Sequence, residues 1–131
     1  MANIGAFGAK AMLDWVLGGA AVTQPSSRLI ALSIGTPTSV SGSEMASNSG
    51  YVRATIQPAA AASPAGSASN TNSITFGPFS TTATIQGCLI YDTISINSGN
   101  IWWYGTLLTA RTPLAGDSMV FNPGSLIVTL S

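Results

Sequence analysis

The chain has 131 residues, of which 46% are hydrophobic and only 6% are charged, and its four basic and four acidic residues give a net charge of zero. Globular proteins average about 25% charged residues. Four scattered basic residues do not form the cationic cluster that nucleic acid requires, and they offer little attraction to anionic lipid, so we expect neither partner. A surface with so few charges is poorly protected against association. We therefore expect one domain over residues 1–131 that forms a homo-oligomer, as a dimer or trimer.

The N-terminal segment predicts a short helix over about residues 4–17, because apolar residues recur there at spacings of three and four. Asn3 suits the N-cap, and Gly18 with Gly19 supplies a stop. Lys10 interrupts the apolar run and no basic start precedes it, so we expect neither a membrane span nor a secretion signal. The broad apolar face predicts docking, either on the chain's own sheet or on a partner.

Short strand-like runs then alternate with polar loops. Residues 28–34, 51–57 and 73–79 have the apolar alternation typical of strands. The intervening loop 35–50 is long for a compact domain, and such loops are usually functional or mobile. Loop 58–72 is of low complexity, which predicts disorder or an extended path along a neighbour.

The most apolar and aromatic part of the sequence predicts a β-hairpin, with strands over 83–91 and 100–109. The cluster Asn97-Ser98-Gly99-Asn100 between them tolerates the left-handed backbone of a tight reversal. On the second strand, alternation gives two faces that are both apolar, Ile101, Trp103 and Leu107 on one side and Trp102, Tyr104, Thr106 and Leu108 on the other. Such a strand needs a cover on each side, and a neighbouring subunit is a candidate for the second cover.

A last hairpin is expected from residues 118–121 and 126–130 around Asn122-Pro123-Gly124. One helix followed by about seven short strands predicts an all-β fold. We expect a small antiparallel β-sandwich or jelly-roll-like barrel with a short N-terminal α-helix.

Catalytic chemistry finds little support in the sequence. There is no histidine, and there is one lysine, so serine and threonine hydroxyls lack the usual activating base. Asp14, Asp92 and Asp117 have structural interpretations in a helix or in turns, and Glu44 alone cannot supply both an acid and a base. Cys88 is the sole cysteine and is interpreted as a small buried hydrophobe. We expect no enzyme activity, no metal and no cofactor.

The aromatic residues of the predicted hairpin allow one alternative function. Trp102, Trp103 or Tyr104 could stack on a sugar ring, as in a carbohydrate-binding module. Tryptophans within strands more often lie in a core or an interface.

The order of features resembles a family of small tailed-bacteriophage virion proteins. The resemblance covers nearly the whole chain, from AKAMLDWVLGG through LIALSIGTPT, SGYVRATI and NTNSITFGPF to SLIVTL. Its most recognisable motifs are Gly50-Tyr51-x-Arg53, Ile90-Tyr91-Asp92, Trp103-Tyr104-Gly105-x-Leu107 and Gly116-Asp117. Members are commonly labelled tail-fibre-like, and similar small β-proteins serve as head decoration, or cement, proteins. The resemblance implies a virion protein that is assembled in the host cytoplasm.

This chain carries less charge than the family pattern, which favours a subunit largely covered by neighbours. We therefore expect a cement protein that binds the major capsid protein on the outside of the head and stabilises it, with a tail-fibre or tail-adaptor subunit as the alternative. Glu44 and Arg53 are interpreted either as an interface ion pair or as solvated surface charges. The candidate interface residues are Phe7, Trp15, Glu44, Tyr51, Arg53, Trp102 and Tyr104.

Overall fold

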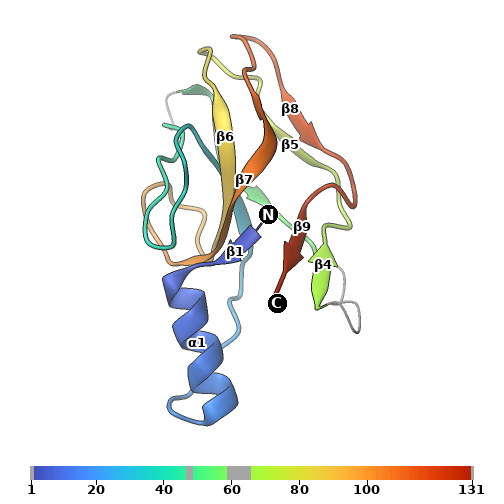
Figure 1. Cartoon of the computed structure of the whole chain (residues 1–131). Coiled ribbons are helices and arrows are strands. Elements are labelled where there is room, and N and C mark those ends of the chain that lie inside the picture. The colour runs from blue at the N-terminus through green and yellow to red at the C-terminus, as the bar shows by residue number, and fades with distance from the viewer. Residues whose placement is uncertain (1, 47–48, 59–65, 131) are drawn as a thin grey trace.

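The computed structural model describes residues 2–46, 49–58 and 66–130, and in this part of the chain it has one helix and nine strands (Figure 1). The elements are β1 (Ala2–Ile4), α1 (Ala6–Leu17), β2 (Leu29–Ser33), β3 (Ala54–Thr55), β4 (Ser67–Ser69), β5 (Ile74–Phe76), β6 (Ile85–Tyr91), β7 (Ile101–Arg111), β8 (Met119–Phe121) and β9 (Ile127–Thr129). All strand pairs are antiparallel. The predicted class, an antiparallel β-protein with one N-terminal helix, is confirmed.

The largest sheet has the strand order β1-β7-β6-β2-β3. Its centre is the predicted hairpin, because β6 pairs with β7 from Gly87 opposite Thr106 to Tyr91 opposite Ile101. In the connection, Asn97 has a φ of 59° and Gly99 a φ of 90°. This left-handed backbone is what the polar cluster predicted.

Two small sheets, β5–β8 and β4–β9, lie beside the large one. The predicted last hairpin is therefore wrong, since β8 and β9 each pair with an earlier strand. The reason is Asn70, which donates from Nδ2 to the carbonyl oxygen of Asn122 at 3.0 Å and accepts from the amide of Leu126 at 3.0 Å. This buried side chain occupies the space between the two segments and directs the chain from one small sheet to the other.

Several predicted boundaries also change. Residues 2–4 form β1 and the helix begins at Ala6 instead of residue 4, so Asn3 lies in a strand instead of at the N-cap, and Gly5 is an N-cap without a side-chain hydrogen bond. Gly18 ends α1 in the left-handed conformation, as predicted. Of the predicted strand 51–57, only Ala54–Thr55 pairs regularly.

The low-complexity loop also contains a strand that the sequence did not predict. Residues 59–65 of this loop lie outside the described residues, whereas Ser67–Ser69 pair with β9 of the same chain.

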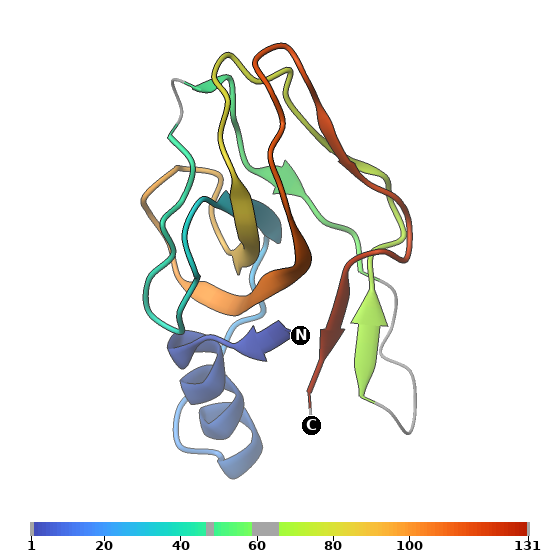
Figure 2. The ribbon, with the colours of Figure 1, turned by 45° about the horizontal axis from the view of Figure 1, so that its top comes forward.

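The described part of loop 35–50 folds back onto β2. The amide of Ile34 donates to Ser43 at 2.8 Å, and the amide of Met45 donates to Leu32 at 3.0 Å. Every residue of β2 is buried, because this loop covers one face of the sheet while the small sheets lie on the other side (Figure 2). Segments of the same chain therefore cover both faces of β2, and no neighbouring subunit is needed there.

Candidate functional site

Helix α1 is anchored to the start of β7 through its first turns. The amide of Gly5 donates to the carbonyl oxygen of Trp102 at 2.8 Å, and the amide of Ala6 donates to Ser39 at 2.9 Å. A Cβ at Gly8 would lie 2.6 Å from the same Trp102 oxygen, so the helix can approach this closely only without a side chain there. The Phe7 ring packs edge-on against Trp102 with centroids 5.2 Å apart.

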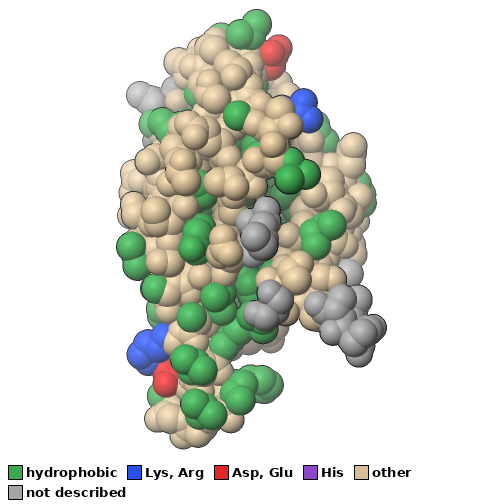
Figure 3. All heavy atoms as spheres, in the orientation of Figure 1, with side chains coloured by type: hydrophobic (Ala, Val, Ile, Leu, Met, Phe, Trp, Pro, Cys, Tyr) green, Lys and Arg blue, Asp and Glu red, His purple; other side chains and the backbone are tan. Residues whose placement is uncertain are grey.

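The second half of α1 projects beyond the β-structure, and its apolar side chains are exposed (Figures 1 and 3). Leu13, Val16 and Leu17 share one side of the helix. Trp15 lies on the same side of the helix as the buried residues Gly8 and Ala11, but its own side chain is 72% exposed. We call these four residues, Leu13, Trp15, Val16 and Leu17, the α1 tip.

The charges of α1 do little to hydrate this end. Lys10 forms an ion pair with Asp14 one turn away, so the two charges satisfy each other along one side. A helix end that is apolar on several sides is normally enclosed by protein. The α1 tip is therefore a candidate docking element.

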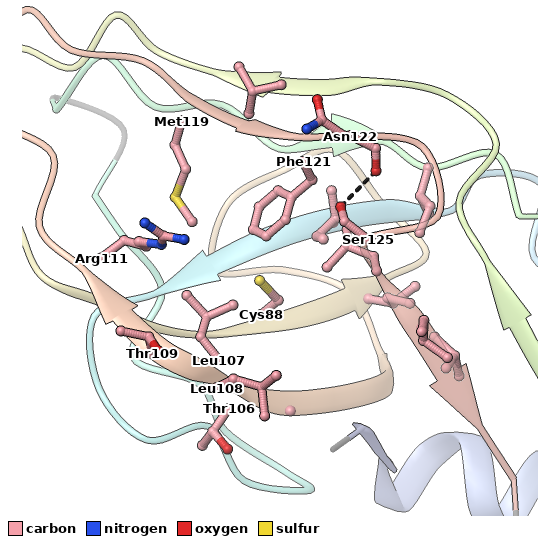
Figure 4. A pocket seen from close by; sticks show the side chains of 18 of the residues that line it. Cys88, Thr106, Leu107, Leu108, Thr109, Arg111, Met119, Phe121, Asn122 and Ser125 are labelled. Carbon is pink, nitrogen blue, oxygen red and sulfur yellow. Dashed lines mark hydrogen bonds between the residues drawn. The ribbon is translucent and has the colours of Figure 1, made fainter.

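A groove of about 1180 Å³, lined by both apolar and polar side chains, opens between β7 and the segment that carries β8 and β9. Leu107 and Cys88 face it from the large sheet, and Met119 and Phe121 face it from β8 (Figure 4). Burial raises the pKa of the Cys88 thiol to about 12, so the thiol is neutral at physiological pH and behaves as a small hydrophobe, as predicted.

The lip of the groove is an irregular part of β7. Pairing with β6 shifts between Gly87 opposite Thr106 and Ile85 opposite Arg111, so residues 107–110 bulge out of the sheet. On the other side of β7, the pairing with β1 ends at Gly105. Leu108, within the bulge, is 100% exposed. An exposed apolar side chain thus stands at the lip of the groove, whose walls combine apolar residues with polar ones such as Arg111 and Asn122.

A second cluster lies inside the chain and centres on a bidentate ion pair. Arg53 donates from Nε and Nη2 to the two carboxylate oxygens of Glu44, each at 2.7 Å, and both side chains are almost wholly buried. Its Nη1 donates to the carbonyl oxygens of Thr93 and Ser98 at 2.7 and 2.9 Å. The guanidinium also lies 3.7 Å from the centre of the Tyr91 ring. The solvated-charge interpretation of Glu44 and Arg53 is thus wrong, because the protein encloses both.

Hydrogen bonds fix the charge states in this cluster. Burial alone would raise the pKa of Glu44, but hydrogen bonds from Arg53, Tyr51 and the amide of Asn97, together with the positive charge of Arg53, hold this pKa below its usual value. Burial raises the pKa of Tyr51, and the neighbouring Glu44 carboxylate raises it further. The Tyr51 hydroxyl donates to Glu44 at 2.8 Å and accepts from the amide of Leu32 at 3.1 Å. The cluster ties two loops to β2.

The structure separates the predicted interface residues into two groups. Glu44, Tyr51 and Arg53 come together in the interior. The other four lie on α1 or β7, where Trp15 is exposed, Phe7 contacts Trp102, and Tyr104 is half-buried between Leu89 and Asn3 on neighbouring strands. The Trp102 indole nitrogen also lies 3.3 Å from the Asp92 carboxylate and donates to it, so this ring is already engaged within the chain.

The sequence predicted a docking face on the N-terminal helix but singled out only Phe7 and Trp15 there as candidate interface residues. Leu13, Val16 and Leu17 carry a helical signal of three- and four-residue spacing that could have identified them. The groove residues Met119 and Phe121 carry no such signal, because β8 meets β7 only in the folded chain.

Among residues 2–46, 49–58 and 66–130, no three His, Cys, Asp or Glu side chains are grouped closely enough to hold a metal ion. No helix in these ranges is long and apolar enough to cross a membrane.

Exposed apolar surfaces such as the α1 tip are typical of proteins that associate with other proteins. A sequence model of the family described as Podophage GP4 fiber I protein gp80 matches residues 3–129. The chain belongs to this family and is a fibre protein of a phage virion. A search of curated proteins found no match.

The family match confirms the predicted resemblance to phage virion proteins and the predicted virion location. It supports the tail-fibre alternative rather than the head decoration function that the sequence led us to prefer. It names no partner.

Proposed function

We propose that the protein is a non-enzymatic structural subunit of the phage tail fibre, held in place by contacts that cover its apolar surfaces. The observation that carries this function is the α1 tip, where four large apolar side chains stand in solvent on a chain with 6% charged residues. Nothing in the described chain covers them, so a neighbouring fibre subunit is the natural cover.

The magnitude of this burial explains why assembly would require repeated contacts. Fully burying one large apolar side chain stabilises by about 1.5–3 kcal/mol, so the four residues of the α1 tip provide at most about 6–12 kcal/mol. Association itself costs about 4–15 kcal/mol. One such contact alone is therefore weak, and several contacts in one fibre reinforce each other.

The internal ion-pair cluster suits a structural role. Its residues come from four segments of the chain. Glu44 belongs to loop 35–46, Arg53 to the segment before β3, Tyr91 to the end of β6, and Thr93 with Ser98 to the loop 92–100. Fixing these segments gives the neighbours of the subunit a rigid surface, which reduces the entropy that association would otherwise cost.

Labelling of intact virions tests this function. An antibody or a small tag on this protein should mark the tail in electron micrographs, and quantitative mass spectrometry should count a handful of copies per virion. Labelled major capsid protein serves as the control for accessibility of the head. Label spread over the head, with hundreds of copies, would refute the fibre function and restore the head decoration alternative.

A further inference from the structure

Helix α1 and the loop of residues 92–100 meet at one side chain, the half-buried indole of Trp102. Phe7 of α1 packs edge-on against this ring, with the two centroids 5.2 Å apart. The indole Nε1 of the same ring donates to Oδ2 of Asp92, the first residue of the loop, at 3.3 Å. A single residue of β7 therefore contacts two segments that are far apart in the sequence.

Asp92 closes the loop in addition to binding the indole. Its Oδ1 accepts from the backbone amide of Asn100 at 2.8 Å, and its Oδ2 accepts from the side-chain amide of Asn100, also at 2.8 Å. Partial burial alone would raise the pKa of Asp92, but the hydrogen bonds from Asn100 and Trp102 hold this pKa below its usual value. The carboxylate is therefore charged at neutral pH, and hydrogen bonds to a charged acceptor are stronger than bonds between neutral groups.

The loop is tightly packed at the point where it closes. A Cβ at Gly99 would lie 2.3 Å from Cγ2 of Thr93 and 2.8 Å from Oδ1 of Asp92. Asp92, Thr93 and Ile94 also form one wall of a hollow of about 620 Å³ beside the start of β2. Because closely packed groups cannot move independently, the position of Asp92 affects the shape of both the loop and this hollow.

The helix depends on Trp102 as well. Of the described elements, α1 packs mainly on β7. The amide of Gly5 donates to the carbonyl oxygen of Trp102 at 2.8 Å, and a Cβ at Gly8 would lie 2.6 Å from the same oxygen. The backbone of Trp102 thus holds the start of the helix while its ring holds Phe7, so the helix cannot leave β7 without freeing the indole.

We propose that Trp102 couples α1 to loop 92–100: release of the helix from β7 loosens the loop, and opening of the loop loosens the helix. Such coupling is reciprocal, because each segment changes the stability of the other by the same free energy. The coupling is a property of the single chain and goes beyond the proposed function. Its consequence for the fibre rests on that function, since a neighbour that covers the α1 tip would hold the helix and thereby order the loop.

The test uses the purified full chain and hydrogen exchange measured residue by residue with NMR. Phe7→Ala removes the helix side of the contact, and Asp92→Ala removes the loop side. Leu13→Ala in α1 and Ile94→Ala in the loop are matched controls, because these side chains are 60% and 65% exposed. Circular dichroism and thermal unfolding check that each variant remains folded. If Asp92→Ala does not fold, Asp92→Asn, which keeps the shape of the side chain, takes its place.

The first readout is transmission from one segment to the other. Phe7→Ala should speed exchange at the backbone amides of Asn97 and Asn100, and Asp92→Ala should speed exchange within α1. Each change should be at least about threefold, the scale on which residues in contact influence each other. The two controls should leave exchange in the other segment unchanged. A Phe7→Ala protein that loosens α1 but keeps both loop amides as protected as in the wild type would overturn the proposal.

Trp102→Phe gives the decisive readout, because an aromatic ring still faces Phe7 whereas the N–H group that donates to Asp92 is lost. In this background Phe7→Ala should still loosen α1 but should no longer speed exchange at Asn100. Transmission that persists undiminished would mean that the loop loosens only because the whole fold is weaker, and it would overturn the role of Trp102. The virion labelling result is independent of these measurements, so failure of the fibre function and failure of the coupling are distinguishable.

Discussion

Arg53 and Glu44 form a bidentate ion pair in which both carboxylate oxygens accept hydrogen bonds at 2.7 Å, and neither side chain is exposed to solvent. Both residues lie in the connection between β2 and β3, and Arg53 links this connection to the loop 92–100 through the carbonyl oxygens of Thr93 and Ser98. A buried ion pair often adds little net stability over an apolar pair, but removing one partner leaves a buried charge without compensation.

We first predict that Glu44→Gln lowers the free energy of unfolding by about 3–5 kcal/mol at neutral pH, because Arg53 keeps its charge and faces an uncharged amide. Urea denaturation measures this loss. The double variant Glu44→Leu with Arg53→Met should be less destabilised than Glu44→Gln, since it removes both charges. A loss below about 1 kcal/mol for Glu44→Gln would mean that the interior tolerates the isolated guanidinium.

A second prediction concerns pH. The pKa of Glu44 is lowered on folding from its ordinary value of 4.5, so the unfolded chain binds a proton at this group more readily than the folded chain. The stability that ionised Glu44 provides is therefore complete above its unfolded pKa and is lost as the pH falls through its lower folded pKa. Unfolding measured from neutral to acidic pH should show a steeper fall in the wild type than in Glu44→Gln. Asp92, whose pKa is also lowered, leaves a residual slope in both proteins.

The third prediction concerns the anchoring of α1. Gly8→Ala places a Cβ 2.6 Å from the Trp102 carbonyl oxygen, and a backbone atom cannot move aside as a flexible side chain can. The substitution should cost about 1–3 kcal/mol through this overpacking, although alanine is the better helix former. Hydrogen exchange should show faster exchange in α1, whereas the exposed helix substitution Lys10→Ala should leave α1 protected. Unchanged protection in Gly8→Ala would contradict the close backbone contact.

A fourth prediction tests the residue that separates β8 from β9. Asn70→Ala removes hydrogen bonds to Asn72, Asn122 and Leu126 from a buried site and should cost about 2–4 kcal/mol. Asn72→Ala, at a more exposed position, should cost less. Urea denaturation measures the loss in the free energy of unfolding, and faster hydrogen exchange at β8 and β9 would show that the loss arises there. Equal losses of stability for the two variants would show that the burial of Asn70 does not strengthen its contribution to stability.

The parts of the fold that depend on neighbouring residues were predictable. The spacing of apolar residues predicts α1, Gly18 predicts its end, and Asn97 with Gly99 predicts the reversal between β6 and β7. The pairing of β8 with β5 was not predictable, because local signals favour a hairpin at Asn122-Pro123-Gly124 and Asn70 acts from far away in the sequence.

The same limit applies to the candidate functional site, where features that depend on distant residues were not predictable. In residues 51–53, Val52 is exposed while Tyr51 and Arg53 are buried, which reverses the usual preference of apolar over charged side chains. Only the folded partners of Arg53 explain this reversal. The sequence also could not separate a head protein from a tail protein, because a weakly charged surface calls for cover by neighbouring subunits in either place.

The bulge at residues 107–110 of β7 has a consequence for the protein before it is incorporated into a particle. The stretch Thr106-Leu107-Leu108-Thr109-Ala110 is uncharged, and a straight strand of this composition at an open border would recruit identical strands into amyloid-like stacks. Displacing four residues breaks the regular repeat of amide and carbonyl groups that such stacking requires. The bulge therefore disfavours edge-to-edge pairing between copies of a chain that carries few charges.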